Sequence, residues 1–263
     1  MPELLLQAEL GNWELVLEWS GQHLQVLLQE ADTKVILAAE GFTGTLMGAT
    51  AWHDVLAHSR LMGLRQLPVC FLCTHYRAVL IPGQLERGVA AAQEQIVLLH
   101  GHEADQSIQF SGIPSIEAGL YWQLPQAVYD WVVRHFMVVQ WKHAAAGWVN
   151  WVVKQPGQTG MVIVYPGRYW LVLGGQGQLL HCWPAPYTSG KDVAWLALQA
   201  CALNQVEASA VQWHLFGLFS TKSALYNDLG QFLENLNCAT QNSYLPDSGL
   251  HDYELIQIKT GQA

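Results

Sequence analysis

The sequence predicts a mixed α/β protein whose two halves repeat the same order of strands and helices. Runs of alternating or continuously apolar residues, typical of strands, occur in groups of three, and turn residues separate the runs within each group. A helical pattern follows each group. Hydrophobic residues make up 51% of the 263 residues, which suffices to bury a core in one large domain or two small ones.

Three strands, a helix and a further strand are predicted in the first half. The strands are "NWELVLEW", "HLQVLLQE" and "KVILAAEGF", and turn signals at Ser20-Gly21 and Ala31-Asp32 separate them. The helix covers "TAWHDVLAHSRLMG", residues 50–63, with Gly63 as its expected end. The apolar run "LPVCFLC" then predicts a short buried strand.

The middle of the chain predicts three helices and two strands. A helix follows Pro82, strands cover 107–112 and 117–124, Pro125 begins a second helix, and "WKHAAAGWVNWVVK", residues 141–154, predicts a third. Trp141 and Trp148 are then seven residues apart on one helical face.

The second half opens with three strands and a helix in the same order. The strands are "GMVIVYP", "RYWLVLGG" and "QLLHCWP", and the "LGGQG" that joins the last two indicates a hairpin turn with positive φ. The helix "SGKDVAWLALQACAL" has Ser189 as its expected N-cap. Asp192 takes the third helical position, where a carboxylate favours the exposed N–H groups.

A strand, a helix and a last strand complete the second half. "SAVQWHLFG" and "HDYELIQIK", residues 251–259, predict the strands. "KSALYNDLGQFLENL", residues 222–236, predicts a helix. Its unbroken apolar stripe is formed by Leu225, Leu229, Phe232, Leu233 and Leu236.

Three antiparallel strands, a helix, a strand, a helix and a strand form the order of a ribonuclease H-like subdomain, and two such units in tandem form the actin-like arrangement. We therefore expect an α/β fold of two ribonuclease H-like subdomains in an actin-like ATPase arrangement, with mixed sheets flanked by helices. The expected subdomains are residues 1–137 at the N-terminus and 138–263 at the C-terminus.

Several segments also resemble a known family. "WPAPYTSGKDVAWLAL" resembles an aromatic–Thr/Ser–Asp–aromatic segment through Tyr187, Thr188, Asp192 and Trp195. "HLFGLFSTKSALYNDLGQFLENL" resembles a strand–Gly–Ser–x–Leu-Tyr–x–x–Leu segment through Gly217, Ser223, Leu225, Tyr226 and Leu229. "AVLIPGQL" and His143 also fit, whereas Trp183-Pro184 stands where an Asn-containing strand end is expected. The chain thus resembles a bacterial family of unknown function, of bacteroidetal type, and this resemblance implies an actin-like ATPase fold.

Actin-like ATPases hold nucleotide phosphates with the first hairpin turn of each half, which normally supplies Asp, then glycines, then Ser or Thr. Glycines let backbone N–H groups approach phosphate oxygens, and the Asp holds Mg²⁺. The first turn here is Glu18-Trp19-Ser20-Gly21-Gln22, with one glycine, one hydroxyl and Glu in place of Asp. It is only partly equipped for phosphate.

The second turn, Tyr165-Pro166-Gly167-Arg168-Tyr169, has neither a carboxylate nor a hydroxyl at its tip, and Pro166 has no N–H to donate. The paired glycines of the adenosine side are reduced to Gly217. The candidate nucleotide-binding residues are Glu18, Ser20, Gly21, Gly167, Arg168 and Gly217. The turns therefore predict a retained scaffold with degenerate phosphate loops.

Metal-dependent chemistry has little support in the sequence, and we expect no metal site and no catalytic residues. A ribonuclease H-like nuclease needs several converging carboxylates, and the strand "MVIVY" offers none. Cys70 and Cys73 have half-site spacing, but positions i and i+3 of a strand face opposite sides, so a buried core pair is expected. The histidines of "HGHE" and "WHDVLAH" are interpreted as surface or loop residues.

The charge balance and cysteine count indicate the compartment and exclude some partners. The net charge of −9 argues against nucleic-acid binding. No apolar run approaches the length of a membrane span, and the start lacks the basic region of a secretory signal. Five cysteines argue against a disulfide framework. We expect a cytoplasmic protein without membrane insertion.

The functional hypothesis is a non-catalytic scaffold or protein-interaction module, a pseudo-enzyme with no cofactor. Twelve tryptophans fit either core packing or a surface for a protein partner. The alternative is a divergent actin-like ATPase or nucleotide-binding protein that takes Mg-ATP. Thermal unfolding with and without Mg-ATP distinguishes the two.

Overall fold

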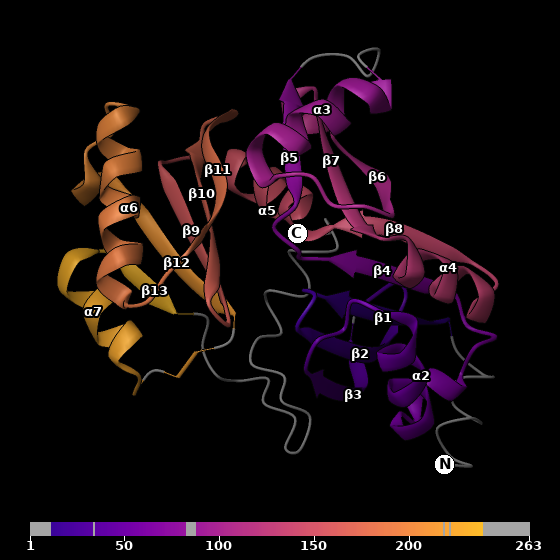
Figure 1. The fold of residues 1–263 in the computed structure, drawn as a ribbon. Helices are drawn as coiled ribbons and strands as arrows, with labels where there is room; N and C mark the ends of the chain where they lie inside the picture. The colour runs from indigo at the N-terminus through magenta and orange to yellow at the C-terminus, as the bar shows by residue number, and fades with distance from the viewer. Residues whose placement is uncertain (1–11, 34, 83–87, 218, 221, 239–263) are drawn as a thin grey trace. The chain divides into compact units, whose positions relative to one another are not determined.

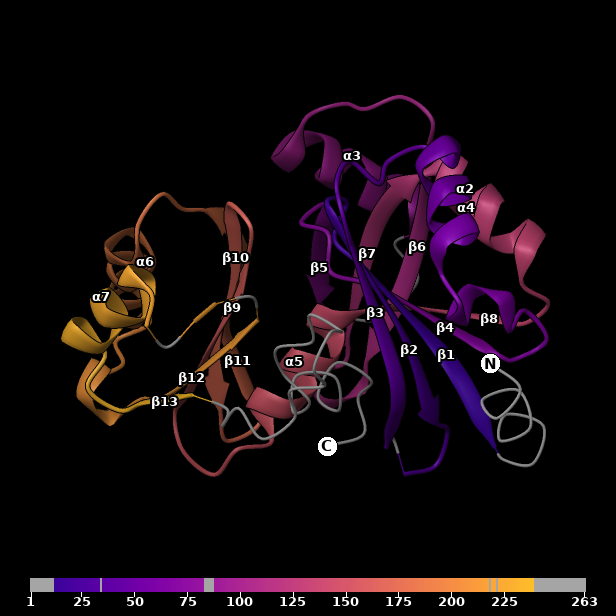
Figure 2. The same cartoon turned by 90° about the horizontal axis from the view of Figure 1, so that it is seen from below.

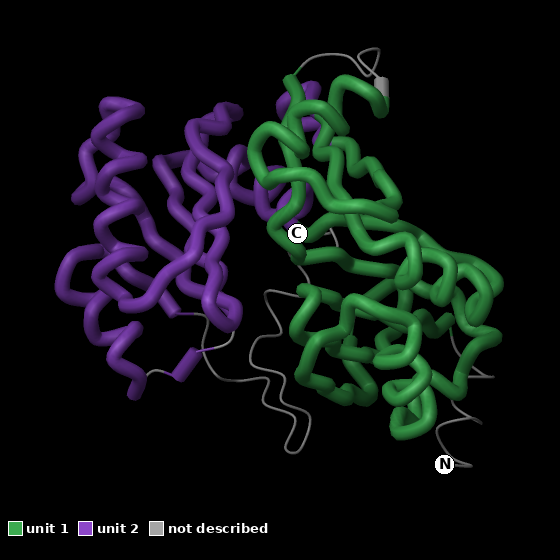
Figure 3. Tube along the Cα trace, viewed as in Figure 1, with its two compact units in different colours: residues 1–112, 119–144, 244–250 green, residues 113–118, 145–243, 251–263 purple. Residues whose placement is uncertain are grey.

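The computed structural model describes residues 12–33, 35–82, 88–217, 219–220 and 222–238, which fall into two compact units. In its described part, unit 1 comprises residues up to 112 together with 119–144, and unit 2 comprises 113–118 and residues from 145 onward (Figure 3). None of the described helices is both long and apolar enough to span a lipid bilayer.

Unit 1 contains a five-stranded sheet in the order β3-β2-β1-β4-β8 (Figures 1 and 2). The strands are β1 (Trp13–Trp19), β2 (His23–Glu30), β3 (Ile36–Thr43), β4 (Val69–Cys73) and β8 (Val139–His143). The first three are antiparallel, and β4 and β8 run parallel to β1. The carboxyl ends of β1, β4 and β8 therefore meet at one edge, where open α/β sheets place their ligands.

One face of this sheet is covered by α2 (Ala49–His58) and α4 (Gln126–His135), which lie side by side (Figure 2). Aromatic rings join the layers: Phe71 of β4 stacks on Trp52 of α2 with ring centroids 6.1 Å apart, and Trp52 lies 5.2 Å from Trp131 of α4. These tryptophans are buried, as the core-packing interpretation of the tryptophan content expects.

A second, three-stranded sheet of unit 1 has the order β5-β7-β6. Its strands are β5 (Ala78–Pro82), β6 (Gln106–Ile113) and β7 (Ala118–Pro125), and α3 (Gly88–His100) packs against it (Figure 1). A small core lies between sheet and helix, made of Val79, Ile81, Ala92, Ile96 and Tyr121. The last residue of β6, Ile113, and the β6–β7 connection are counted with unit 2.

Unit 2 repeats the strand order of the first sheet, as β11-β10-β9-β12-β13. The strands are β9 (Thr159–Tyr165), β10 (Arg168–Gly175), β11 (Gln178–Pro186), β12 (Gln212–Gly217) and β13 (Leu236–Cys238). Helices α6 (Gly190–Leu203) and α7 (Ala224–Phe232) cover one face (Figure 1). On the other, α5 (Ala144–Val153) places Trp148 with its ring centroid 5.7 Å from that of Trp170. Short 3-10 turns complete the described elements, at Leu61–Gly63, Pro114–Ile116 and Ala208–Ala210.

Local signals in unit 2 form the structures that they predict. Ser189 caps α6, and its side chain accepts from the N–H of Asp192 while the Asp192 side chain accepts from the Ser189 N–H, a complete capping box. Gln176 and Gly177, between β10 and β11, have φ values of +54° and +82°. The predicted hairpin turn with positive φ is thereby confirmed.

Three predicted helices are wrong in extent. The helix predicted over 50–63 ends at His58, where Ser59 caps it, and a separate 3-10 turn contains Gly63. The helix predicted over 141–154 begins at Ala144, because residues 139–143 pair with β4 as β8. Trp141 and Trp148 therefore lie on different elements and share no helical face.

The helix predicted over 222–236 covers only Ala224–Phe232. Its C-cap is Leu233, and Leu236 belongs to β13, so the predicted stripe is interrupted. Phe232 is 45% exposed, whereas Leu229 and Leu233 are buried. The strand predicted over 251–259 lies outside the described residues.

Candidate functional site

The first hairpin turn, between β1 and β2, joins three of the predicted site residues: Glu18, Ser20 and Gly21. The N–H of Ser20 donates to the carbonyl of His23 over 2.9 Å, and the Ser20 hydroxyl accepts from the N–H of His23 over 3.1 Å. The serine side chain is therefore bonded within its own turn.

Gly21 is buried in this turn at a φ of +92°. A Cβ atom at this position would lie 3.0 Å from Cδ2 of His75 and 3.2 Å from the sulfur of Met47. Both residues come from outside the hairpin, His75 from the segment after β4 and Met47 from the segment after β3. Side chains of the protein itself thus occupy the space beside the glycine.

The segment after β3 is also tied to the turn by its backbone. The N–H groups of Gly44 and Leu46 donate to the carbonyls of Gln22 and Gly21, over 2.9 and 2.8 Å. The Leu46 carbonyl in turn accepts from the indole of Trp19 over 2.9 Å. These bonds hold the turn against the core.

Glu18 lies one residue before Trp19 and is 3% exposed. In the sheet register it pairs with Gln25 of β2 and Leu72 of β4. The structure therefore places Glu18 in β1, before the turn, with its side chain buried.

His75 and His143 connect the carboxyl ends of β4 and β8. Nε2 of His143 lies 2.9 Å from the carbonyl oxygen of His75, and the His143 N–H donates to the hydroxyl of Ser111 over 2.9 Å. His143 is buried beside Trp122, and burial lowers its pKa to about 4. His143 is therefore neutral at pH 7 and joins the two strand ends as a structural hydrogen-bonding group.

The second hairpin turn joins Gly167 and Arg168 in unit 2. Gly167 has a φ of +72° and open space where a Cβ would lie. Its carbonyl accepts from the N–H of Tyr187 over 3.3 Å, and the Tyr187 hydroxyl donates to the carbonyl of Tyr165 over 3.2 Å. Tyr187, one of the family-like residues, directly follows β11 and holds this turn through these two hydrogen bonds.

Gly217 ends β12 beside the second turn, opposite Val164 of β9. Its φ is +99°, and an added Cβ would lie 2.1 Å from the Val164 carbonyl oxygen. Only glycine permits this close approach of two strands. The structure thus brings Gly167, Arg168 and Gly217 to one end of the unit 2 sheet, and explains Gly217 by packing.

The start of α6 carries the other family-like polar residues. Oδ2 of Asp192 accepts from the Thr188 hydroxyl over 2.7 Å and from the N–H groups of Thr188 and Ser189, each over 2.9 Å. These hydrogen bonds, led by that of the Thr188 hydroxyl, lower the pKa of Asp192 to about 2. The carboxylate is engaged in capping the helix.

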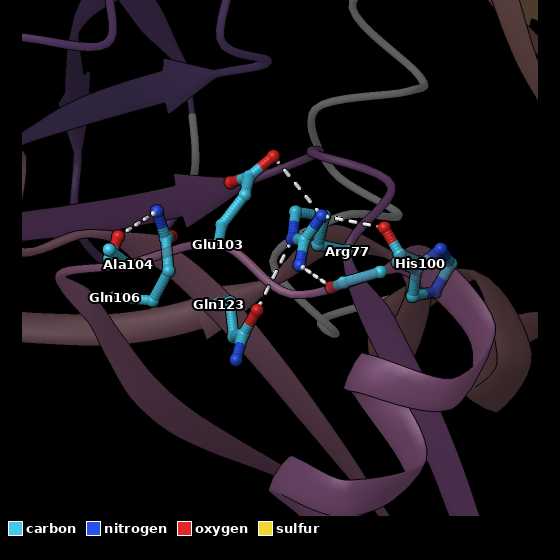
Figure 4. Close-up of polar contacts among 7 residues, drawn as sticks. Arg77, His100, Glu103, Ala104, Gln106 and Gln123 are labelled. Carbon is cyan, nitrogen blue, oxygen red and sulfur yellow. Dashed lines mark hydrogen bonds and ion pairs between the residues drawn. The ribbon is translucent and has the colours of Figure 1, made fainter.

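Sequence reasoning missed Arg77, which follows β4 and is 2% exposed by its side chain. Its guanidinium donates to the carbonyls of His100 and Gly101 over 2.9 and 2.6 Å, and to Oε1 of Gln123 over 3.2 Å (Figure 4). Glu103 completes the set with a 3.1 Å ion pair. Arg77 thus joins the end of α3 to β7 through hydrogen bonds, with Glu103 as its ion-pair partner.

Metal-ligand clusters of three or more His, Cys, Asp or Glu do not occur among the residues that the structure describes. Cys70 and Cys73 are both buried in β4, as expected for core cysteines, and burial raises the pKa of the Cys73 thiol. The side chains of His53 and His58 are exposed on α2.

Most of the described tryptophans belong to the core, but two are exposed in unit 2. Trp195 on α6 is 61% exposed, and Trp183 on β11 is 39% exposed. An indole exposed to this degree is typical of interaction surfaces.

Comparison with solved structures identifies the fold. A Bacteroides thetaiotaomicron protein with actin-like ATPase fold and unknown function matches 95% of this chain and 96% of its own, at a TM-score of 0.77 and 12% identity. A chain of the PilM–PilN type IV pilus biogenesis complex matches 94% and 95%, at 0.54 and 13%. The ethanolamine utilization protein EutJ from Carboxydothermus hydrogenoformans matches 99% and 98%, at 0.51 and 8%. The predicted mixed α/β, actin-like ATPase fold is confirmed.

Sequence comparison gives one family and no individual relative. No curated protein resembles the chain closely enough in sequence to count as a match. A family model described as "Protein of unknown function (DUF3822)" matches residues 57–236, more than half of the chain. The predicted membership of a family of unknown function is thus confirmed: the chain belongs to the DUF3822 family.

Proposed function

We propose that this protein is a non-catalytic scaffold or protein-interaction module built on an actin-like fold with degenerate phosphate loops. The observation that carries the proposal is the closure of the first hairpin turn. The Ser20 hydroxyl bonds to His23 of the same turn, and the His75 ring lies against Gly21. A phosphate-binding turn needs these groups to be available to the ligand.

The second hairpin turn supports the same proposal. Pro166 contributes no N–H, and the carbonyl of Gly167 is bonded to Tyr187. The hydroxyl of Thr188 is bonded to Asp192. These polar groups near the turn are therefore engaged within unit 2.

A protein partner is favoured by the exposed aromatic residues and by one related fold. Trp195 on α6 is 61% exposed. It is also one of the residues through which the chain resembles the family of unknown function. A chain of the PilM–PilN pilus biogenesis complex has the same fold and functions within a protein assembly. Both observations fit an actin-like fold used for docking.

Thermal unfolding of the full chain with and without millimolar Mg-ATP tests the absence of nucleotide binding. A ligand at about 100 times its dissociation constant adds about 2.7 kcal/mol to the stability of the folded state. We expect no shift in melting temperature. A rise that disappears in both Ser20→Ala and Arg168→Ala would overturn the proposal in favour of a divergent actin-like ATPase.

Photo-crosslinking tests the partner. A photoreactive amino acid replaces Trp195 in one variant and Glu207, which is exposed elsewhere in unit 2, in a control variant. We expect one discrete adduct with another protein from position 195 and none from position 207. Equal labelling from both positions would contradict a docking role of the Trp195 surface.

A further inference from the structure

Strand β6 ends the three-stranded sheet of unit 1, and its edge differs from the other sheet edges of the described chain. It is eight residues long, "QSIQFSGI", with neither proline nor a charged side chain. Natural proteins usually protect such edges with charges, prolines, bulges or short strands, because an unprotected edge pairs with other chains.

The other terminal strands carry these protections. β13 has three residues, β5 ends in Pro82, and β8 contains Lys142. β11 contains Pro184 and Pro186. β3 contains Glu40, and its pairing with β2 shifts register at Leu28/Gln29. Within the described residues, β6 is therefore the long terminal strand without a charge or proline to block pairing.

The side chains of β6 provide an apolar strip next to this edge. Ile108 and Phe110 are two residues apart and so share one face of the strand. Ile108 packs on the core beneath α3, and Phe110 is 37% exposed, with its ring centroid 5.1 Å from that of Tyr121. The Phe110 ring also covers Gly119, where an added Cβ would lie 2.5 Å away. An added strand would extend this apolar face.

Only the first five residues of β6 are suited to docking. Further along, the Ser111 hydroxyl is bonded to the indole of Trp122 and to the N–H of His143, and Ile113 is buried. Gln106–Phe110 are half-buried or exposed, and the polar face there carries a Gln109–Ser107 hydrogen bond of 2.9 Å. A partner strand therefore meets an apolar face and a polar face, as in an ordinary sheet.

Charge defines the partner further. Residues 101–125, which contain β6 and β7, include Glu103, Asp105 and Glu117 but no lysine or arginine. Glu103 is paired with Arg77, whereas Asp105 and Glu117 are exposed, one before β6 and one after it. A basic residue at the end of a docked segment next to Gln106 would complement Asp105, whereas Glu117 lies beyond the residues suited to docking.

We propose that the edge of β6 at Gln106–Phe110 binds an extended segment of a partner protein by strand addition. The segment has alternating apolar side chains and a lysine or arginine at the end that lies next to Asp105. This inference deepens the proposed function and rests on it, since it names the docking surface of an interaction module.

The test is hydrogen exchange on the full chain with a probe peptide, acetyl-Lys-Lys-Val-Thr-Val-Thr-Val-Lys-Lys-amide. We expect new protection of those amides of Gln106–Phe110 that face away from β7, because only the outward row of N–H groups is left for an added strand. A peptide with glutamates in place of the lysines should have an affinity lower by about tenfold or more. Two further peptides are N-methylated at alternate residues, so that each lacks the N–H groups along one of its two edges. One of them should lose binding and the other retain it, because strand addition uses only one edge of the peptide.

Matched protein variants separate the charge from the strand edge. Asp105→Asn should weaken binding, while Glu207→Gln, an equal charge change at an exposed position of unit 2, should not. Gln109→Lys, which places a charge on the edge strand, should also weaken it. Thermal unfolding confirms that each variant is folded.

Several results would overturn the inference. These are equal binding of both N-methylated peptides, protection elsewhere than β6 or none at millimolar peptide, and outward-facing β6 amides already protected in the free protein. Protection that appears with protein concentration alone would assign the edge to a second copy. A melting shift with Mg-ATP that disappears in Ser20→Ala and Arg168→Ala refutes the proposed function instead, so the two failures are distinguishable.

Discussion

Nε2 of His143 lies 2.9 Å from the carbonyl oxygen of His75, and this bond joins the carboxyl ends of two parallel strands beside the first hairpin turn. A carbonyl only accepts, so Nε2 carries the hydrogen, and burial, which lowers the His143 pKa, favours the neutral ring. Because His75 also lies against Gly21, His143 supports the group that closes the turn. The family-like histidine thus has a structural role that links the sheet to the candidate site.

Stability should fall as the pH is lowered from about 6.5 to 4, because burial lowers the pKa of His143 to about 4. The unfolded chain takes up a proton below its ordinary pKa of 6.5, while the folded chain does not, so acid favours unfolding. The full effect is about 3 kcal/mol. Urea unfolding at several pH values measures it.

His143→Gln is the control for this pH dependence. Its amide can still donate to the His75 carbonyl but does not titrate. We expect the variant to have a flatter stability profile between pH 6.5 and 4. An unchanged slope would assign the acid sensitivity to other groups, among them His181, whose pKa burial also lowers.

Gly217→Ala should destabilise the protein by about 3 kcal/mol or more, because it combines a positive φ with a clash against the Val164 carbonyl. Gly167→Ala is the matched control, since Gly167 also has a positive φ but open space around it, and its cost should be nearer 1 kcal/mol. Denaturant unfolding compares the two. Equal losses of stability in the two variants would show that the positive φ alone sets the cost, with no contribution from the clash with Val164.

Arg77→Met should cost about 3 kcal/mol, because it leaves the His100 and Gly101 carbonyls and the Gln123 side chain without their shared donor. Arg77→Lys should recover only part of the loss, since an ammonium group cannot reproduce the planar fork. In Arg77→Met, the amides at the end of α3 should exchange hydrogen faster than in the unmodified protein. Glu103→Gln, at a 40% exposed side chain, should cost less than about 1 kcal/mol.

The sequence predicted elements whose signals are local and missed those that distant pairing creates. The Ser189 cap and the Gln176-Gly177 turn depend on neighbouring residues, and both form as expected. Residues 141–143 of β8 were predicted as the start of the helix that continues into α5, and only their pairing with β4 makes them a strand. Tertiary pairing overrides the local pattern there.

The candidate site divides in the same way. Both hairpin turns were located from glycines and strand patterns, which are local. The contact of His75 with Gly21 and the hydrogen bonds of Arg77 join residues that are far apart in the chain. Arg77 and Gln123, for example, are 46 positions apart. No spacing rule in a single sequence indicates such contacts.

Ser189→Ala should destabilise unit 2 by about 1 kcal/mol, because the serine side chain satisfies an N–H group in the first turn of α6. Ser189→Asp should retain most of the stability, since aspartate is also a good N-cap, although it places a second carboxylate near Asp192. Ser223, the N-cap of α7, gives an independent comparison, because its side chain accepts from Tyr226 without a capping box. We expect Ser189→Ala to cost more than Ser223→Ala in urea unfolding, since it removes one of the two reciprocal bonds of the box. The reverse order would show that the Asp192 side chain holds the start of α6 without the serine.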